Sequence, residues 1–383
     1  MTRGRVAVVG AGLAGASAAA ALARSGLTVD LIAAPDPASA GASRLPLGVL
    51  HPHLASQSDP LVRLRRQGLR ATHAWLAFLA GHGFDNGLVA QGALVRVDSE
   101  RGRRRRDRLG NGDGGARRLS IAEARRHAGV TLSEAGILQP AGACIAPGGL
   151  IRALLASGGG RIHKHPGRVT SLLRGTDGWR LGCDTDVPRH TYSQVIVATG
   201  IHSRTLVPAL GKDLVATRGQ ATAVAASSDT LAQRLPISGN GYITPAVDGR
   251  HWIGATITRD DDSLDPRDAD DAANLARFAA LWPSADNPRI VDRFVGVRAT
   301  TPDRLPIVDE VDSGLWVTVG HGSHGLGTAP LAGILIASAI SGRHLGRPEH
   351  DLRAILGAER RALRRARERR DRAESSWHRS GLL

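Results

Sequence analysis

Apolar and polar positions along the first forty residues follow two different periods. The apolar runs Val6–Val9 and Leu27–Ala33 are each short enough for a buried strand, and the Ala-rich segment Ser17–Arg24 between them suits a helix. A glycine-rich stretch, Gly10–Gly15, joins the first run to the helical segment. This order of strand, turn, helix and strand predicts the opening unit of a doubly wound α/β domain.

The same two patterns predict elements along the rest of the chain. Helices are expected over residues 61–81, 121–127, 148–157, 268–281 and 331–340, a pair of strands over 88–97, and single strands over 161–162, 169–173, 193–200, 215–224, 241–245, 252–256 and 315–319. Residues 215–294 therefore indicate an antiparallel sheet with a helix, inserted into the nucleotide-binding domain as a substrate domain.

A dinucleotide-binding loop with the spacing Gly-x-Gly-x-x-Gly is predicted at the end of the first strand. It consists of Gly10, Ala11, Gly12, Leu13, Ala14 and Gly15. The first glycine makes the turn, the second lets the backbone approach a pyrophosphate, and the third lets the helix pack closely on the strand. The helix that follows offers free N–H groups and a partial positive charge to the phosphates. We predict a bound nucleotide here rather than a merely structural turn.

This loop does not define which nucleotide is bound. An acidic residue at the end of the second strand commonly binds the ribose hydroxyls, but Ala33 occupies that place. Asp36, in the following loop, is the candidate for reaching back to the ribose. Asp30 is nearer the usual spacing but lies inside the strand, where an ordinary polar strand residue is the alternative.

Two later stretches of small residues also suggest a cofactor edge. Ala198-Thr199-Gly200 ends a buried strand at a turn that allows close backbone approach to a ligand. A second glycine-rich stretch, Gly320–Pro330, leads into the apolar helix and predicts another anion- or ring-binding turn. Together with the first loop, they indicate one nucleotide domain assembled from distant segments.

Composition narrows the class of protein. Hydrophobic residues make up 42% of the 383 residues, which allows a large core and two or three domains. Cys144 and Cys183 are the only cysteines and form no CxxC motif, so neither a zinc site nor a disulfide framework is indicated, and a cytoplasmic location is expected. Arg3 and Arg5 before an apolar run suit a signal peptide, but the glycine loop fills the middle of that run. No apolar run is expected to span a bilayer.

The net charge of +15 is concentrated in two arginine runs. Residues 100–118 and residues 359–372 each carry eight arginines against three acidic residues. Such runs bind nucleic acid through phosphate contacts, or they are solvated loops and tails. Lysine occurs only at Lys164 and Lys212, so the use of arginine also resembles a coding bias.

In their order along about residues 5–345, these motifs resemble the D-amino-acid-oxidase-type FAD oxidoreductases, which include glycine and sarcosine oxidases. The resemblance rests on the glycine loop, Ala198–Gly200, Gly241–Pro245 with Gly254–Thr256, and Gly296–Pro306. Within that group the chain is most similar to the C-terminal oxidase part of the MnmC family, the bifunctional tRNA 5-methylaminomethyl-2-thiouridine biosynthesis proteins. That finer similarity rests on Gly41–Ser43 with Gly48–Pro52, Arg218–Gln220, Thr301–Pro306, and His324–Leu326 with Ala329–Leu331. The methyltransferase half of those proteins has no counterpart in this sequence.

The resemblance implies an α/β fold. A discontinuous, glutathione-reductase-like Rossmann-type FAD-binding domain is expected over residues 1–85, 145–214 and 295–345. An inserted substrate domain, an antiparallel β-sheet plus helix, is expected over 86–144 and 215–294, and a basic C-terminal tail over 346–383. Beyond the glycine loop, the predicted FAD contacts are Asp36, Ser43, Val169, Ala198, Thr199, Gly200, Arg298, Gly322, Ser323, His324, Gly325, Leu326 and Gly327.

The resemblance also implies a reaction. The substrate would be a tRNA wobble (thio)uridine carrying a carboxymethylaminomethyl group, and its FAD-dependent oxidation would give the aminomethyl nucleoside and glyoxylate. The tRNA anticodon loop would be a partner, with the arginine runs on its phosphates and a separate tRNA methyltransferase acting afterwards. Two alternatives stay open. One is an FAD-dependent oxidase or dehydrogenase of a free amino acid such as glycine, sarcosine or a D-amino acid, and the other is a catalytically inactive, flavin-containing tRNA-binding protein.

Three residues are the candidates for holding the substrate. Arg298 is the expected carboxylate anchor, because a guanidinium binds a carboxylate through two parallel charged hydrogen bonds; a structural ion pair with Asp303 is the alternative. The resemblance places Tyr242 beside it as a hydroxyl donor, with a core ring as the alternative. Arg218 is expected either to add positive charge at the site entrance or to stabilise a strand edge.

Two histidine pairs lie in loops beside the expected flavin. They are His51 with His53 and His321 with His324. No metal site is predicted, because a carboxylate or thiolate partner is missing from the pattern, so hydrogen bonds to cofactor or substrate are expected instead.

Four residues depart from the family pattern. Leu45 and Leu47 fill a loop that is more polar in the family, His324 replaces a usual Arg, and Cys144 replaces a common aromatic residue. The departures at Leu45, Leu47 and His324 motivate the inactive alternative.

Overall fold

The computed structural model describes residues 4–33, 41–52, 60–97, 115–187, 190–282 and 288–343, together with residues 352, 356 and 357. Its helices are α1 (Leu13–Arg24), α2 (Pro60–Gly81), α4 (Ile121–Ala128), α5 (Pro147–Ser157), α6 (Ser203–Leu206), α7 (Asp268–Leu281) and α8 (Gly325–Ser341), with single-turn segments η2 (Gly41–Arg44), η3 (Gly159–Arg161), η4 (Gly200–His202), η5 (Pro208–Leu210) and η6 (Gly322–His324). The strands form two sheets and a hairpin.

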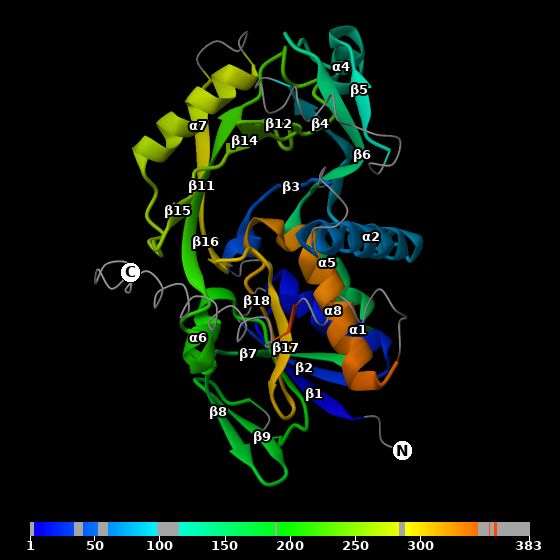
Figure 1. Ribbon diagram of the computed structural model, residues 1–383, viewed down its shortest axis with the longest axis vertical. Coiled ribbons are helices and arrows are strands. Elements are labelled where there is room, and N and C mark those ends of the chain that lie inside the picture. Colours follow the sequence, from blue (N-terminus) through cyan, green and yellow to red (C-terminus); the bar gives the residue numbers. More distant parts are fainter. Residues whose placement is uncertain are drawn as a thin grey trace, which may run out of the picture.

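The first sheet is the framework of the nucleotide-binding half. Its six strands lie in the order β17 (Ile307–Asp312), β18 (Leu315–Val319), β10 (Val195–Val197), β1 (Arg5–Val9), β2 (Thr28–Ala33) and β7 (Ile162–Pro166). All neighbours are parallel except β17, which pairs antiparallel with β18. Figure 1 shows α1 and α8 side by side along this sheet, and both pack in one core with Val6 and Val8.

Both faces of the parallel sheet are buried, which explains its continuous apolar runs. Ala7 and Val9 point away from α1 and pack with Trp179 and Tyr192. Trp179 belongs to a hairpin formed by β8 (Val169–Gly175) and β9 (Gly178–Cys183). The hairpin therefore covers the face opposite the helices.

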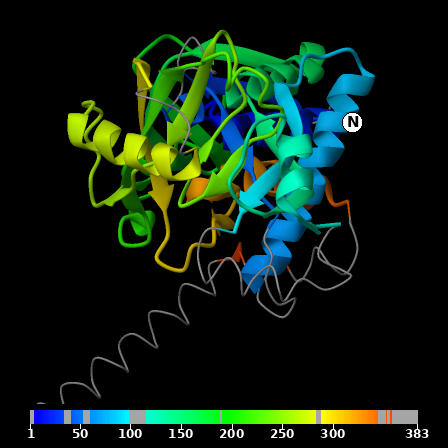
Figure 2. The same ribbon diagram turned by 90° about the horizontal axis from the view of Figure 1, so that it is seen from above.

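The second sheet is larger and mostly antiparallel. It contains β3 (Gly48–Leu50), β4 (Leu88–Arg96), β5 (Arg117–Leu119), β6 (Gly136–Ile145), β11 (Val215–Ala225), β12 (Ile237–Gly239), β13 (Gly241–Ile243), β14 (Arg250–Gly254), β15 (Thr258–Arg259) and β16 (Ile290–Thr300). Phe278 of α7 and Trp282 just after it pack on one face with Ile243 and Ile253. Figures 1 and 2 show α7 along the outer side of this sheet.

The predicted α/β class and its Rossmann-type sheet are confirmed, and most predicted elements match those of the structure. The strand pair expected over 88–97 is wrong, because β4 is one strand that runs along β6 with two register shifts. Gly92, with φ 98, adopts the left-handed conformation at the second of these shifts, between Gln91 and Ala93. The glycine thus makes a bulge rather than a hairpin turn.

The helix expected over 331–340 begins six residues earlier, at Gly325. Tertiary packing keeps its glycines helical, since a Cβ on Gly68 of α2 would lie 2.3 Å from the carbonyl oxygen of Gly327. The stretch Gly322–Ser341 is long and apolar enough to cross a membrane, which corrects the expectation of no such run, and 61% of its most apolar window is buried inside the protein. That burial is what a core helix of this length shows.

The predicted division into domains cuts through the second sheet. The predicted FAD-binding ranges include strand β3 and the last residues of β16, but both pair within the larger sheet. The two sheets therefore do not coincide with the predicted domain boundaries, which remain a prediction.

Candidate active site

The glycine loop is shaped by close contact with the turn after β10. Gly10 has φ 98, and a Cβ there would lie 2.7 Å from the carbonyl oxygen of Ala198. A Cβ on Gly15 would lie 1.7 Å from the carbonyl oxygen of Gly10. The Leu13 N–H at the start of α1 donates to Ser43 Oγ at 3.0 Å. Backbone amides and two distant turns thus meet at one helix N-terminus, a cradle that suits a pyrophosphate.

The rest of the predicted nucleotide edge is partly placed. Thr199 bonds through Oγ1 to Ser203 Oγ at 2.9 Å, and Gly200 has φ 59. Val169 starts β8 with its side chain in the core of the hairpin face. Asp36 lies outside the described residues.

Asp30 is more than an ordinary polar strand residue. Its carboxylate is fully buried and accepts hydrogen bonds from Arg5 Nη1 at 2.8 and 2.9 Å, His165 Nε2 at 3.0 Å and Tyr192 Oη at 3.0 Å. Burial alone would raise the pKa of Asp30, but the hydrogen bonds from His165, Arg5 and Tyr192 together hold it below its usual value. Both oxygens are occupied, so Asp30 ties β2 to its neighbours rather than presenting itself to a ribose.

Arg298 and Tyr242 lie close together on the larger sheet. Arg298 Nη1 donates to Ser323 Oγ at 2.7 Å, and no acidic side chain among the described residues pairs with this guanidinium. Asp303 accepts instead from the Leu305 N–H at 3.1 Å. Burial lowers the pKa of Arg298, while Tyr242 acts in the opposite direction. Burial raises the pKa of Tyr242 to about 12, partly offset by the charge of Arg298.

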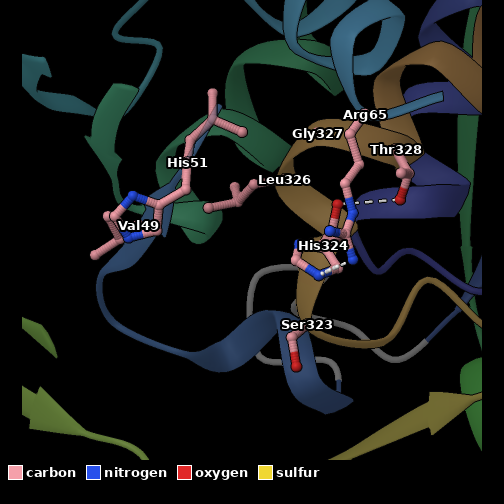
Figure 3. Close-up of a pocket in the computed structure, with 9 residues that line it drawn as sticks. Val49, His51, Arg65, Ser323, His324, Leu326, Gly327 and Thr328 are labelled. Atoms are coloured by element: carbon pink, nitrogen blue, oxygen red, sulfur yellow. Dashed lines mark hydrogen bonds between the residues drawn. The ribbon is translucent and has the colours of Figure 1, made fainter. Parts of the chain in front are cut away.

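A pocket lies at the N-terminus of α8, as Figure 3 shows, and Ser323, the hydrogen-bond partner of Arg298, is among the residues that line it. Its lining residues are Val49, Leu50, His51, Arg65, Ser323, His324, Leu326, Gly327 and Thr328. Arg65 Nη2 of α2 lies 2.7 Å from His324 Nε2. Because a guanidinium only donates, Nε2 of His324 is the acceptor in this contact.

No motif in the sequence singles out Arg65, although the composition of its helix gives a signal. Helix α2 carries four arginines and no acidic residue over Pro60–Gly81. A positive helix of this kind points to an anionic neighbour or ligand, and in the structure one of its arginines reaches the predicted cofactor loop.

His51 and His321 are both held by hydroxyl groups. His51 Nε2 lies 2.8 Å from Ser238 Oγ and its Nδ1 lies 3.3 Å from Gln139 Oε1. His321 bonds Thr318 Oγ1 at 3.0 Å and Thr328 Oγ1 at 2.9 Å. His53 lies outside the described residues, and no group of three or more His, Cys, Asp or Glu side chains in the described part of the chain has a metal-binding arrangement.

The half-buried imidazole of His321 predicts a pH-dependent stability. Burial lowers the pKa of His321 to about 4, so between that value and about 6.5 the unfolded chain binds more protons than the folded protein. The contribution of His321 to the free energy of unfolding is complete above about pH 6.5. It decreases as the pH is lowered, by about 1–2 kcal/mol between pH 7 and pH 5. We expect chemical unfolding of His321→Asn to show a correspondingly smaller loss between these pH values. An equal loss in the variant and the wild type would contradict the assignment.

Arg218 is a structural residue, which settles its two alternatives. Its side chain is fully buried, pairs with Asp270, and donates to Gln220 Oε1 at 3.0 Å and to the Asp265 carbonyl at 2.5 Å. It stabilises the strand, and the idea of a charge at the site entrance is wrong.

The departures at Leu47 and Cys144 form one apolar cluster with Ala221, Ala223 and Trp252, against which Leu45 packs. Burial raises the pKa of Cys144 to about 12, so this thiol stays protonated.

The two arginine runs lie outside the described residues except for Arg117 and Arg118, which are exposed.

Three comparisons place this geometry among known proteins. The family described as FAD dependent oxidoreductase (DAO) matches residues 5–339. The bifunctional MnmC protein of Nitrosospira multiformis is 31% identical over 92% of this chain and 60% of its own length, and that of Burkholderia pseudomallei is 33% identical over 88% of this chain and 56% of its own. This chain thus spans less than two thirds of the curated relatives it matches.

Solved structures show the same fold. Glycine oxidase from Geobacillus kaustophilus superposes with a TM-score of 0.77 at 24% identity, covering 90% of this chain and 96% of that one. Iminodiacetate oxidase from Chelativorans sp. BNC1 has a TM-score of 0.74 at 26% identity, covering 89% of this chain and 96% of that one.

Proposed function

This chain belongs to the DAO family of FAD-dependent oxidoreductases, and from that membership we propose that it oxidises the carboxymethylaminomethyl group on the wobble (thio)uridine of tRNA. The observation that carries the proposal is the guanidinium of Arg298, which has no acidic partner in the described part of the chain and lies beside Tyr242. An N-substituted glycine brings the carboxylate that such a group needs. The tRNA is inferred from the similarity to the MnmC proteins.

The family's cofactor is FAD, and the glycine cradle fits its pyrophosphate. Gly10 and Gly15 leave no room for side chains, and α1 begins at Leu13 with no acidic residue in its first turn. We assign the pyrophosphate to this cradle and the flavin to the turn Gly322–Gly327. FAD supplies the two-electron acceptor for the substrate carbon.

The side chains around Arg298 orient the substrate. Arg298 holds the carboxylate by two parallel charged hydrogen bonds, and the Tyr242 hydroxyl, protonated because of its raised pKa, donates a third. The buried apolar cluster that contains Leu47 and Cys144 approaches Tyr242 through Cys144, and it would keep water from the reacting carbon.

The proposed reaction is an oxidation followed by a hydrolysis. The amine nitrogen and the CH₂ carbon between it and the carboxylate together lose two electrons and two protons, and the bond between them becomes an imine. Water adds to the C=N bond, which breaks to leave the primary amine of the aminomethyl nucleoside and glyoxylate. Oxygen or another acceptor would finally receive the two electrons, and a separate tRNA methyltransferase would use the amine.

A free amino acid is the second candidate substrate. It is favoured by the fold shared with glycine oxidase and by the similarity to iminodiacetate oxidase. The chemistry at Arg298 would be the same without RNA.

Anaerobic mixing of the FAD-loaded protein with each substrate tests the proposal. We expect tRNA carrying the carboxymethylaminomethyl group to bleach the yellow flavin much faster than glycine or N-methylglycine at equal concentration. Bleaching by the free amino acids alone would select the second candidate. A flavin that no substrate bleaches would leave the inactive tRNA-binding protein.

Replacing Tyr242 by phenylalanine is expected to raise KM about tenfold, because one hydrogen bond to a charged group is lost. A pKa of about 12 keeps this hydroxyl protonated, so the pH dependence of kcat/KM between about pH 6 and pH 9 should keep its shape in the variant. Steady-state kinetics across this range make the test. A basic limb that disappears in the variant would show that Tyr242 titrates, contrary to the proposal.

A further inference from the structure

Strand β11 places the consecutive residues Arg218, Gly219 and Gln220 on alternating faces of the larger sheet. Arg218 and Gln220 face α7, where Arg218 pairs with Asp270 and Gln220 Nε2 donates to Asp271 Oδ1 at 2.9 Å. Both side chains are fully buried. Gly219 therefore faces the opposite side of the sheet, which is the side of the proposed site.

Gly219 lies directly under the guanidinium of Arg298. In the antiparallel pairing of β11 with β16, Gly219 is opposite Gly296, and Thr217 is opposite Arg298. The Arg298 side chain folds across to the glycine, so that a Cβ at position 219 would lie 2.1 Å from Nη2 and 3.1 Å from Cζ. No side chain other than hydrogen fits beneath the group in this position.

The other terminal nitrogen of the same guanidinium, Nη1, is held by a residue of the cofactor turn. Nη1 donates to Ser323 Oγ at 2.7 Å, and Ser323 lies in η6 just before α8. The group thus lies between the bare backbone of β11 and one hydroxyl. This arrangement defines its position. Its other N–H donors have no hydrogen-bond partner in the described part of the chain, so they can serve a ligand.

We propose that Gly219 is a positioning residue. Because it has no side chain, it leaves a space above the backbone of β11, here called the slot, that the guanidinium of Arg298 occupies. The slot sets the position and orientation that the guanidinium needs to bind the substrate carboxylate. The buried bonds of Arg218 and Gln220 keep the floor of the slot in place by tying β11 to α7. The inference rests on the proposed function only in taking the ligand of Arg298 to be a carboxylate. A displacement of about 1 Å in such a group can cost up to about a hundredfold in rate or affinity.

A crystal structure of the FAD-loaded Gly219→Ala variant tests the slot without any substrate. Gly219 does not adopt the left-handed conformation, so alanine is allowed by the backbone, although its Cβ would lie 3.0 Å from the Thr256 carbonyl oxygen. We expect the β11–β16 register to be kept and the guanidinium to leave Ser323 Oγ. A guanidinium still bonded to Ser323 would overturn the proposal.

Kinetics then test what the slot does. With tRNA carrying the carboxymethylaminomethyl group, Gly219→Ala should raise KM about ten- to a hundredfold while FAD content and thermal stability stay near those of the matched strand control, Gly175→Ala. A Cβ at Gly175 would make only an ordinary contact of 3.6 Å. In the Arg298→Ala background the same substitution should have no further effect on kcat/KM.

The outcomes separate this inference from the proposed function. An unchanged KM, or an equal loss with and without Arg298, would overturn the positioning role of Gly219. A wild-type protein that oxidises N-methylglycine but not the tRNA would reject the proposed substrate, and the same kinetic cycle with N-methylglycine would still decide the role of the slot.

Discussion

Replacement of Arg298 by alanine is expected to lower kcat/KM for the modified tRNA by about 10²–10⁴-fold, because two charged hydrogen bonds of about 1.5–3 kcal/mol each are lost. The FAD content should not change, since among the described residues the hydrogen bond of Arg298 to the cofactor turn goes to the Ser323 side chain. Steady-state kinetics and the visible spectrum of the purified variant measure both quantities.

Arg298→Lys is the matched control for charge. A lysine keeps one positive charge but cannot form the two parallel bonds, so we expect it to restore only part of the lost activity. Turnover of the alanine variant at the wild-type rate would show that the carboxylate is bound elsewhere. Loss of FAD in both variants would point to a structural role.

Replacement of Gly15 by alanine is expected to abolish FAD binding. A Cβ at this position would lie 1.7 Å from the carbonyl oxygen of Gly10, and that backbone cannot move without opening the contact with Ala198. The ratio of flavin to protein absorbance and the far-UV circular dichroism report cofactor and fold separately. Gly160→Ala is the control, because a Cβ there meets no atom within 4 Å.

Gly12→Ala is a second test of the cradle, to be used if the Gly15→Ala protein does not fold. Its Cβ would lie 3.3 Å from Ser43 Oγ and contact no backbone atom, so we expect a folded protein with weakened FAD affinity. If Gly15→Ala keeps a full complement of FAD, the assignment of the pyrophosphate to this cradle is wrong.

The sequence pattern was sufficient where one element carries its own signal. The glycine spacing and the two apolar runs predicted β1, α1 and β2, and the helical period predicted α7 at its observed bounds. The opening βαβ unit and the amphipathic helices are local structures, so their residues carry the information in order along the chain. The family motifs added the neighbourhood of Arg298 and Tyr242, which lie on β16 and β13.

Contacts between distant segments were not predictable in the same way. His324 and Arg65 are 259 positions apart, and Asp30 and Tyr192 are 162 apart. No period along the chain links such residues, because their approach is decided by the packing of whole elements. The early start of α8 has the same origin, since contact with Gly68 of α2 keeps Gly327 helical where local propensity favours a turn.

Successive side chains of a strand point to opposite faces of the sheet, and this explains why the short motif Arg218-Gly219-Gln220 contacts both α7 and Arg298. Arg218 was expected either to add charge at the site entrance or to stabilise a strand edge, and the structure supports the second role. Arg218 and Gln220 are both buried against α7, and the residue between them faces Arg298. A sequence shows that Arg-Gly-Gln lies in a strand, but the face that each residue takes depends on the register with β16.

Nucleoside mass spectrometry of tRNA, before and after incubation with the FAD-loaded protein and oxygen, tests the central claim most directly. We predict that the carboxymethylaminomethyl nucleoside is converted to the aminomethyl nucleoside, with one glyoxylate released for each, and that the Arg298→Ala protein leaves the tRNA unchanged. An unaltered nucleoside profile with the wild-type protein, whose flavin is intact, would contradict it.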